Sequence, residues 1–69
     1  MEYTKQLKKA IDYSKRVSKK LGHNYIGTEH LLLGLLRQKD TLTYELLTAE
    51  NITEEHITQL IFEYIAEEN

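Results

Sequence analysis

A leucine-rich run between residues 31 and 36 constrains the fold of this 69-residue chain more than any other feature. Five of its six positions are leucine, namely Leu31, Leu32, Leu33, Leu35 and Leu36. In a helix these side chains would point to nearly every side, so no single packing face could cover all of them. The run therefore predicts a central, buried helix that other helices surround.

The residues before the run predict how this central helix begins. Thr28 stands at the expected N-cap, where its hydroxyl can accept a backbone N–H of the first turn. Glu29 follows in that first turn, where the helix dipole favours a carboxylate. Gly22 and Gly27 flank the polar segment that precedes it. We therefore expect a glycine-flanked turn, followed by a helix from about Thr28 to Arg37.

Helical periodicity predicts three further helices. The first begins near Thr4 and ends at Gly22, which can take the left-handed conformation common at helix ends. A short helix follows a cap at Thr41 or Thr43, and the last helix follows a cap at Thr53. The positions expected to face the core are Leu7, Ala10, Ile11, Ser14, Val17, Ser18 and Leu21, then Leu42, Leu46, Leu47 and Ala49, and finally Ile57, Leu60, Ile61, Tyr64 and Ile65.

These elements predict an all-α fold, a compact bundle of about four helices in one domain over residues 1–69. Gly34 interrupts the leucine run, although glycine costs about 1 kcal/mol relative to alanine inside a helix. Its position indicates that another helix crosses closely there, or that the residue lies in a tight contact. The small side chains of Ser14 and Ser18 would allow the leucine-rich helix to approach the first helix.

Composition excludes several classes of protein. The chain has no cysteine, so it can form neither a disulfide nor a thiolate metal site. No apolar segment approaches the roughly 18 residues of a membrane span, and the N-terminus lacks the apolar stretch of a signal peptide. We therefore expect a cytoplasmic protein without a membrane partner.

Charge is unevenly distributed along the chain. Residues 1–22 carry seven basic and two acidic side chains, a balance of +5, whereas residues 23–69 carry two basic and nine acidic ones, a balance of −7. A basic helix can bind nucleic acid. However, no aromatic or arginine-rich set is interleaved with the lysines. We therefore expect residues 5–20 to present a solvated basic face, complemented by an acidic one, and no nucleic-acid partner.

The histidines and carboxylates do not form a recognisable catalytic or metal-binding pattern. His23, His30 and His56 lack the spacing that brings three or four ligands to one metal ion. Glu29 and His30 are adjacent, so on a helix they point about 100° apart and do not face each other. We expect His30 to pack under the turn with one nitrogen bonded to the backbone, and His23 to act similarly. The sequence predicts no catalytic residues, no metal and no cofactor.

One segment carries a resemblance to a known family: residues 21–37, which read LGHNYIGTEHLLLGLLR. It resembles the signature of the Clp N-terminal repeat, which usually occurs as a tandem pair at the front of Clp-type AAA+ unfoldases such as ClpC and ClpA. The flanking segments fit by pattern, so the resemblance covers nearly the whole chain as one repeat, half of the usual tandem. It implies a non-catalytic module of protein quality control, which docks adaptor or substrate proteins and passes them to a Clp ATPase ring.

The start of the leucine-rich helix is the candidate ligand site. Backbone N–H groups at a helix N-terminus can hold an anion, and a neighbouring carboxylate can hold a guanidinium. In ClpC-type domains of Gram-positive bacteria, the Gly-Thr-Glu of this signature contributes to a pocket for phosphoarginine-tagged substrates. The resemblance places that role on Gly27, Thr28 and Glu29. The alternative is that Thr28 and Glu29 simply cap the helix.

A second class of function stays open, a structural or regulatory module that pairs with another Clp repeat or with itself. The face that the second repeat covers in the family should be apolar in this chain. Large exposed apolar patches favour association. We therefore expect a homodimer through that face.

Overall fold

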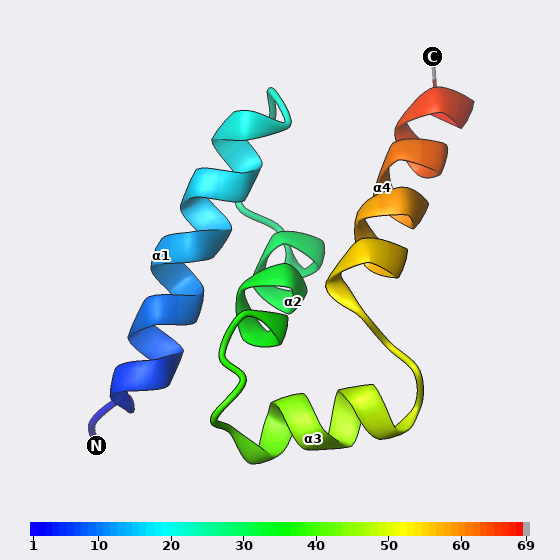
Figure 1. Ribbon diagram of the computed structural model, residues 1–69. Helices are drawn as coiled ribbons and strands as arrows, with labels where there is room; N and C mark the ends of the chain where they lie inside the picture. Colours follow the sequence, from blue (N-terminus) through cyan, green and yellow to red (C-terminus); the bar gives the residue numbers. More distant parts are fainter. Residues whose placement is uncertain (69) are drawn as a thin grey trace.

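The computed structural model describes residues 1–68, and these contain four helices (Figure 1). They are α1 (Lys5–Lys20), α2 (Thr28–Leu36), α3 (Leu42–Ala49) and α4 (Glu54–Glu68). No strand occurs in this range, so the predicted all-α fold of four helices is confirmed. The last residue of the predicted domain, Asn69, lies outside the described residues.

The central position of α2 is also confirmed. Figure 1 shows α1 along one side of α2, α4 on the other side, and α3 crossing the end of the group. Within residues 1–68, every pair of helices whose backbones pack together includes α2. The result is a flat molecule with extents of 39 × 26 × 17 Å. Because α1 and α4 are separated by α2, each keeps a side that no other helix covers.

Hydrogen bonds confirm the predicted N-caps of α1, α3 and α4. The hydroxyl oxygens of Thr4, Thr41 and Thr53 each accept a backbone N–H from three residues ahead, at 3.1, 3.1 and 3.2 Å respectively. Thr41, and not Thr43, is therefore the cap of α3. Gly22 follows α1 with φ +78°, the left-handed conformation that was expected.

α2 begins at Thr28 as predicted, but the assignment of Thr28 as its N-cap was wrong. Gly27 is the N-cap, with extended backbone angles of φ −103° and ψ 177°, and Thr28 is the first helical residue. The turn is closed by His30, whose Nδ1 accepts the Gly27 N–H at 2.7 Å. His30 thus does what Glu or Gln does in a capping box, reaching back from the third helical position to the N-cap. Glu29 lies in the first turn, as predicted.

The core is small and smaller than predicted. Its buried apolar side chains are Ala10, Leu33, Leu36 and Ile61. The other three leucines of α2 are only partly buried. Five positions expected to face the core are instead exposed, namely Leu42, Leu46, Ala49, Leu60 and Tyr64. Periodicity identifies the apolar side of a helix, but it does not tell whether another helix covers that side.

The crossing of α1 and α2 explains Gly34. A Cβ added at Gly34 would overlap the carbonyl oxygen of Ala10 and lie 2.9 Å from its carbonyl carbon. The two helices therefore meet almost backbone to backbone, which confirms the tight contact predicted at this position. Ser14 and Ser18 are buried on the same side of α1, as their small size predicts.

We expect Gly34→Ala to destabilise the fold, although alanine is the better helix former by about 1 kcal/mol. The colliding atoms belong to the α1 backbone, so the helices must separate, at a cost of about 1–3 kcal/mol or more. Urea denaturation followed by circular dichroism measures the change. The exposed substitution Lys8→Ala on α1 is the control, expected to stay within about 0.5 kcal/mol. Equal stability of Gly34→Ala and the unchanged protein would contradict the close crossing.

Candidate functional site

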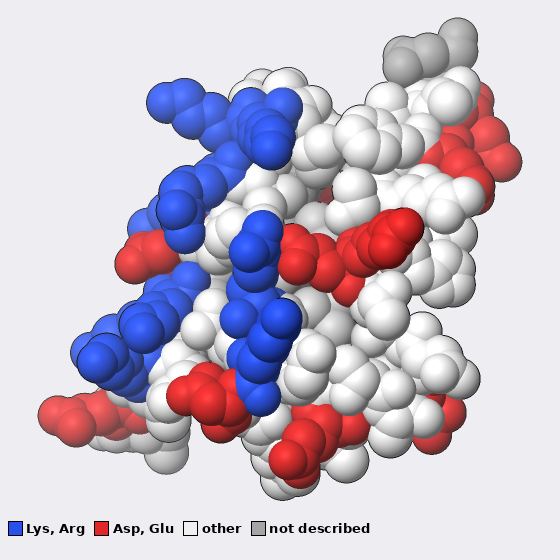
Figure 2. All heavy atoms as spheres, viewed as in Figure 1, with Lys and Arg blue, Asp and Glu red and all other residues white. Residues whose placement is uncertain are grey.

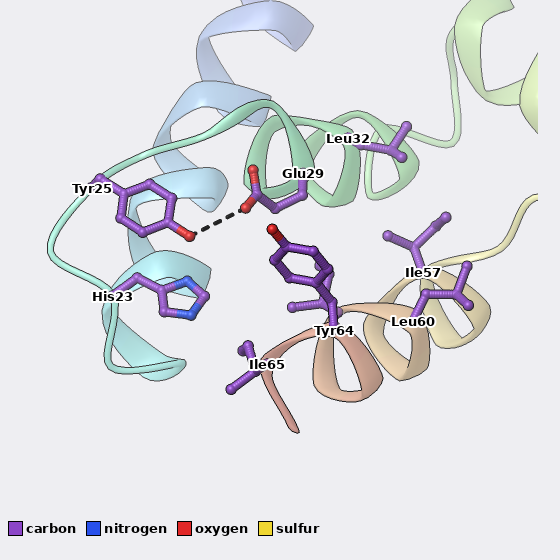
Figure 3. Close-up of a pocket in the computed structure, with 9 residues that line it drawn as sticks. His23, Tyr25, Glu29, Leu32, Ile57, Leu60, Tyr64 and Ile65 are labelled. Carbon is purple, nitrogen blue, oxygen red and sulfur yellow. Dashed lines mark hydrogen bonds between the residues drawn. The ribbon is translucent and has the colours of Figure 1, made fainter. Parts of the chain in front are cut away.

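The start of α2 forms one wall of a groove between α2 and α4, here called the α2–α4 groove (Figure 3). Its volume is about 570 Å³. One wall is polar and comes from the segment that precedes α2 and from its first turn, with the side chains of His23, Tyr25 and Glu29. The other lining residues are apolar or aromatic and come from α2 and α4, namely Leu32, Ile57, Leu60, Ile61, Tyr64 and Ile65.

The carboxylate of Glu29 lies over Gly27. A Cβ at Gly27 would overlap Glu29 Oε1 and would lie 3.2 Å from Cε2 of Tyr25. The backbone angles of Gly27 suit any residue, and a side chain here would meet only other side chains, chiefly the flexible end of Glu29, which would have to shift. The Tyr25 hydroxyl donates to Glu29 Oε2 at 3.4 Å. Glu29 is thus held at the mouth of the groove by the shape of the turn.

His30 holds the turn from beneath. It is fully buried, and its Nδ1 accepts the Gly27 N–H. Its Nε2 lies 2.8 Å from Nδ1 of His23. Because Nδ1 of His30 is an acceptor, the neutral ring carries its proton on Nε2 and donates it to His23. The predicted role of His30 is confirmed, whereas His23 bonds to the His30 ring and not to the backbone as expected.

Aromatic contacts fix the rest of the turn. The rings of His23 and Tyr25 stack with centroids 5.1 Å apart and an interplanar angle of 8°. Both meet the His30 ring edge-on, with centroids 5.0 and 5.3 Å away. The Ser18 hydroxyl donates to the Tyr25 carbonyl, which ties the turn to α1. His23 and Tyr25 were not predicted as site residues, because helical periodicity carries no signal for a turn.

The structure places the three predicted site residues together at the start of α2. Thr28 is exposed, and Glu29 and Gly27 are partly buried beside the groove. The first N–H groups of α2 lie at this end, next to the Glu29 carboxylate. The arrangement can therefore hold an anion at the helix end and a cation at Glu29.

Other polar groups lie outside the groove. Glu54 Oε1 accepts the Tyr13 hydroxyl at 2.9 Å and Arg37 Nε at 3.0 Å, which joins α4 to α1 and to the end of α2. The Arg37 guanidinium also lies 4.7 Å from the centroid of the Tyr13 ring. Contact with Tyr13 and attraction to Glu54 raise the pKa of Arg37 above its usual value. This cation therefore has partners within the fold.

Lys and Arg gather mainly over α1 in Figure 2, and Asp and Glu are prominent over α4. Among the residues that the structure describes, no Lys or Arg lines the α2–α4 groove. Within residues 1–68, no three His, Cys, Asp or Glu side chains are grouped so that they could hold a metal ion. In the same range, no helix combines the length and the apolar character that crossing a membrane requires.

We expect NMR of the imidazole nitrogens to find His30 as the Nε2–H tautomer, because its Nδ1 accepts the Gly27 N–H. His30→Phe keeps a ring but leaves that N–H without its acceptor, and should cost about 1–3 kcal/mol of folding free energy. His56→Phe, on the exposed side of α4, is the control. A proton on Nδ1 of His30 would contradict its role in the cap.

Comparison with known proteins finds a family model, described as the Clp repeat (R) N-terminal domain, that matches residues 2–69. The negative regulator of genetic competence ClpC/MecB of Bacillus subtilis is 45% identical over 47 residues, which are 68% of this chain and 6% of that protein. The chaperone protein ClpB of Oceanobacillus iheyensis is 43% identical over 47 residues, with the same shares.

The chloroplastic chaperone protein ClpC1 of Arabidopsis thaliana is 34% identical over 67 residues, which are 97% of this chain and 7% of that protein. The chain thus spans only a small fraction of the length of these relatives. No solved structure gives a significant match. The family model covers all but the first residue, and the four helices agree with it. The chain therefore belongs to the family of Clp repeat N-terminal domains.

Proposed function

We propose that this chain is a non-catalytic recognition module of a Clp-type unfoldase in the cytoplasm, where it binds adaptor or substrate proteins for the ATPase ring. The observation that carries the proposal is the Glu29 carboxylate, which lies at the mouth of a groove and beside the N-terminus of α2. Membership of the Clp repeat family supports the same role. Neither nucleic acid nor a membrane is a proposed partner.

The proposed ligand is a phosphoarginine side chain on a tagged protein. Its phosphoryl group would bind the N–H groups of the first turn of α2 and the exposed hydroxyl of Thr28. Its guanidinium would bind the carboxylate of Glu29 in a charge-assisted, bidentate manner. Gly27 contributes by having no side chain, which leaves Glu29 in place.

The alternative role of Thr28 as the helix cap is weakened by the hydrogen bonds at the start of α2, whereas Glu29 does lie in the first turn, where its charge also favours the helix. The cap is completed by Gly27 and His30. Thr28 is exposed and lies inside the helix rather than at the N-cap. Its hydroxyl is therefore not needed to begin the helix, which supports a role in binding.

We expect phosphoarginine to bind, and Glu29→Gln to weaken its binding by about tenfold or more, because a charged hydrogen bond is replaced by a neutral one. Gly27→Ala should also weaken binding, because the new Cβ displaces the carboxylate while its backbone angles suit alanine. NMR titration measures both effects. Glu45→Gln, on α3 and away from the groove, is the control. No shifts at millimolar phosphoarginine would overturn the proposed ligand.

A second candidate is a structural or regulatory module that pairs with a second copy of itself or with another Clp repeat. The chain exposes 5532 Å². A compact monomer of 8.1 kDa is expected to expose about 4,500 Å². The excess includes apolar side chains on α3 and α4 with more than half of their surface exposed, namely Leu42, Leu46, Phe62 and Tyr64. Such a surface favours association.

We expect light scattering at high micromolar concentration to give about twice the mass of one chain, because pairing would cover this apolar surface. Phe62→Glu should restore the monomer, since it places a charge on the exposed side of α4. The control is Tyr3→Glu, which changes an exposed aromatic residue at the N-terminus. A single-chain mass for the unchanged protein at that concentration would exclude the dimer.

A further inference from the structure

The α2–α4 groove extends beyond its charged end at Glu29. Figure 3 shows the Tyr64 ring projecting from α4 toward Glu29 and the Ile57 side chain directed toward Leu32. Leu60 also lines the groove, although its side chain points away from Tyr25 and Glu29. The volume of about 570 Å³ lies within the range of sites that hold small ligands or side chains. A charged group bound at Glu29 would leave this apolar part exposed to water.

We propose that the apolar part of the groove binds a bulky apolar side chain of the partner, close in sequence to the basic or phosphoarginine residue held by Glu29. The recognised unit is then a short segment of a partner protein that carries both. This inference rests on the proposed function and adds a sequence preference to it.

Charge complementarity supports a cationic segment. Of the described residues that line the groove, Glu29 is the one Asp or Glu, and none is a Lys or Arg. The carboxylate is partly buried, so a cation is attracted to it more strongly than in open water. An acidic or purely apolar segment would leave this carboxylate without a counter-charge.

A folded second copy of this chain offers few such segments. The bulky apolar or aromatic residues within two positions of a Lys or Arg are Tyr3, Leu7, Ile11, Tyr13, Val17, Leu21, Leu35 and Leu36. All of them except Tyr3 are partly or fully buried within the copy's own fold. The N-terminus of a second copy, with Tyr3 and Lys5 exposed, is therefore the competing occupant, and the experiment below separates it from the proposed occupant, an extended segment of another protein.

The spacing follows from backbone geometry. In an extended segment, side chains two positions apart point to the same side. A basic residue at Glu29 therefore directs the side chain two positions away toward the same surface, where Leu60 and Ile57 lie on α4. The residue in between points away and is free to vary.

Two peptides test the inference, each with one phosphoarginine in a Gly-Ser background and with Leu or Ala two positions away. We expect the Leu peptide to bind at least about tenfold more tightly, because burial of the Leu side chain adds to binding. Leu60→Ser should remove most of this preference. Leu60 is 45% exposed, so the fold should tolerate the change, and circular dichroism checks it. Leu46→Ser, an exposed leucine on α3, is the control and should keep the preference.

The outcomes separate the inference from the proposed function. Equal binding of the two peptides, with phosphoarginine itself still bound, would overturn the inference and leave the proposed function standing. Binding of a Leu peptide with unmodified Arg, lost in Leu60→Ser, would support the groove even if free phosphoarginine does not bind. If the protein forms a dimer that Leu60→Ser dissociates but added Leu peptide does not dissociate, the groove belongs to a second copy, and the inference is overturned.

Discussion

The close crossing of α1 and α2 at Ala10 and Gly34 is the contact on which the rest of the structure depends. It brings the buried side of α1, with Ser14 and Ser18, against α2 and the turn before it. Ser18 then holds the Tyr25 carbonyl, and the turn is short enough for His30 to reach the Gly27 N–H. The crossing and the Ser18 bond hold the turn against α1, and the local bond between His30 and Gly27 fixes the first turn of α2, from which Glu29 projects.

This chain of contacts explains which features could be predicted from the sequence. The leucine run and Gly34 are local signals, and they predict both the central helix and its tight crossing. The N-cap of α2 was mispredicted because a threonine before a leucine run is a common N-cap, whereas a histidine acting from the third position is not. Its partner His23 lies in a turn, where no periodic pattern exists.

The groove could not be predicted because its walls come from distant parts of the chain. Glu29 and Leu60 are 31 positions apart, and both sit in patterns that have an ordinary explanation, as a helix-start carboxylate and as a core leucine. Only the placement of α4 shows that Leu60 is exposed and lines the same groove as Glu29. Periodicity predicts an apolar side for α4, but the presence or absence of a neighbour is a tertiary property.

The two candidate functions use largely different sides of α4, although Tyr64 is exposed and also lines the groove. Positions 60 and 62 are two residues apart, so their side chains point about 200° apart around the helix. Leu60 lines the α2–α4 groove, whereas Phe62 lies beside Val17 and Leu21 of the α1 side. Pairing through the Phe62 side would therefore leave Glu29 open. A dimer of this kind would present two recognition grooves at once, and binding of a partner with two tagged segments would then gain from their effective concentration.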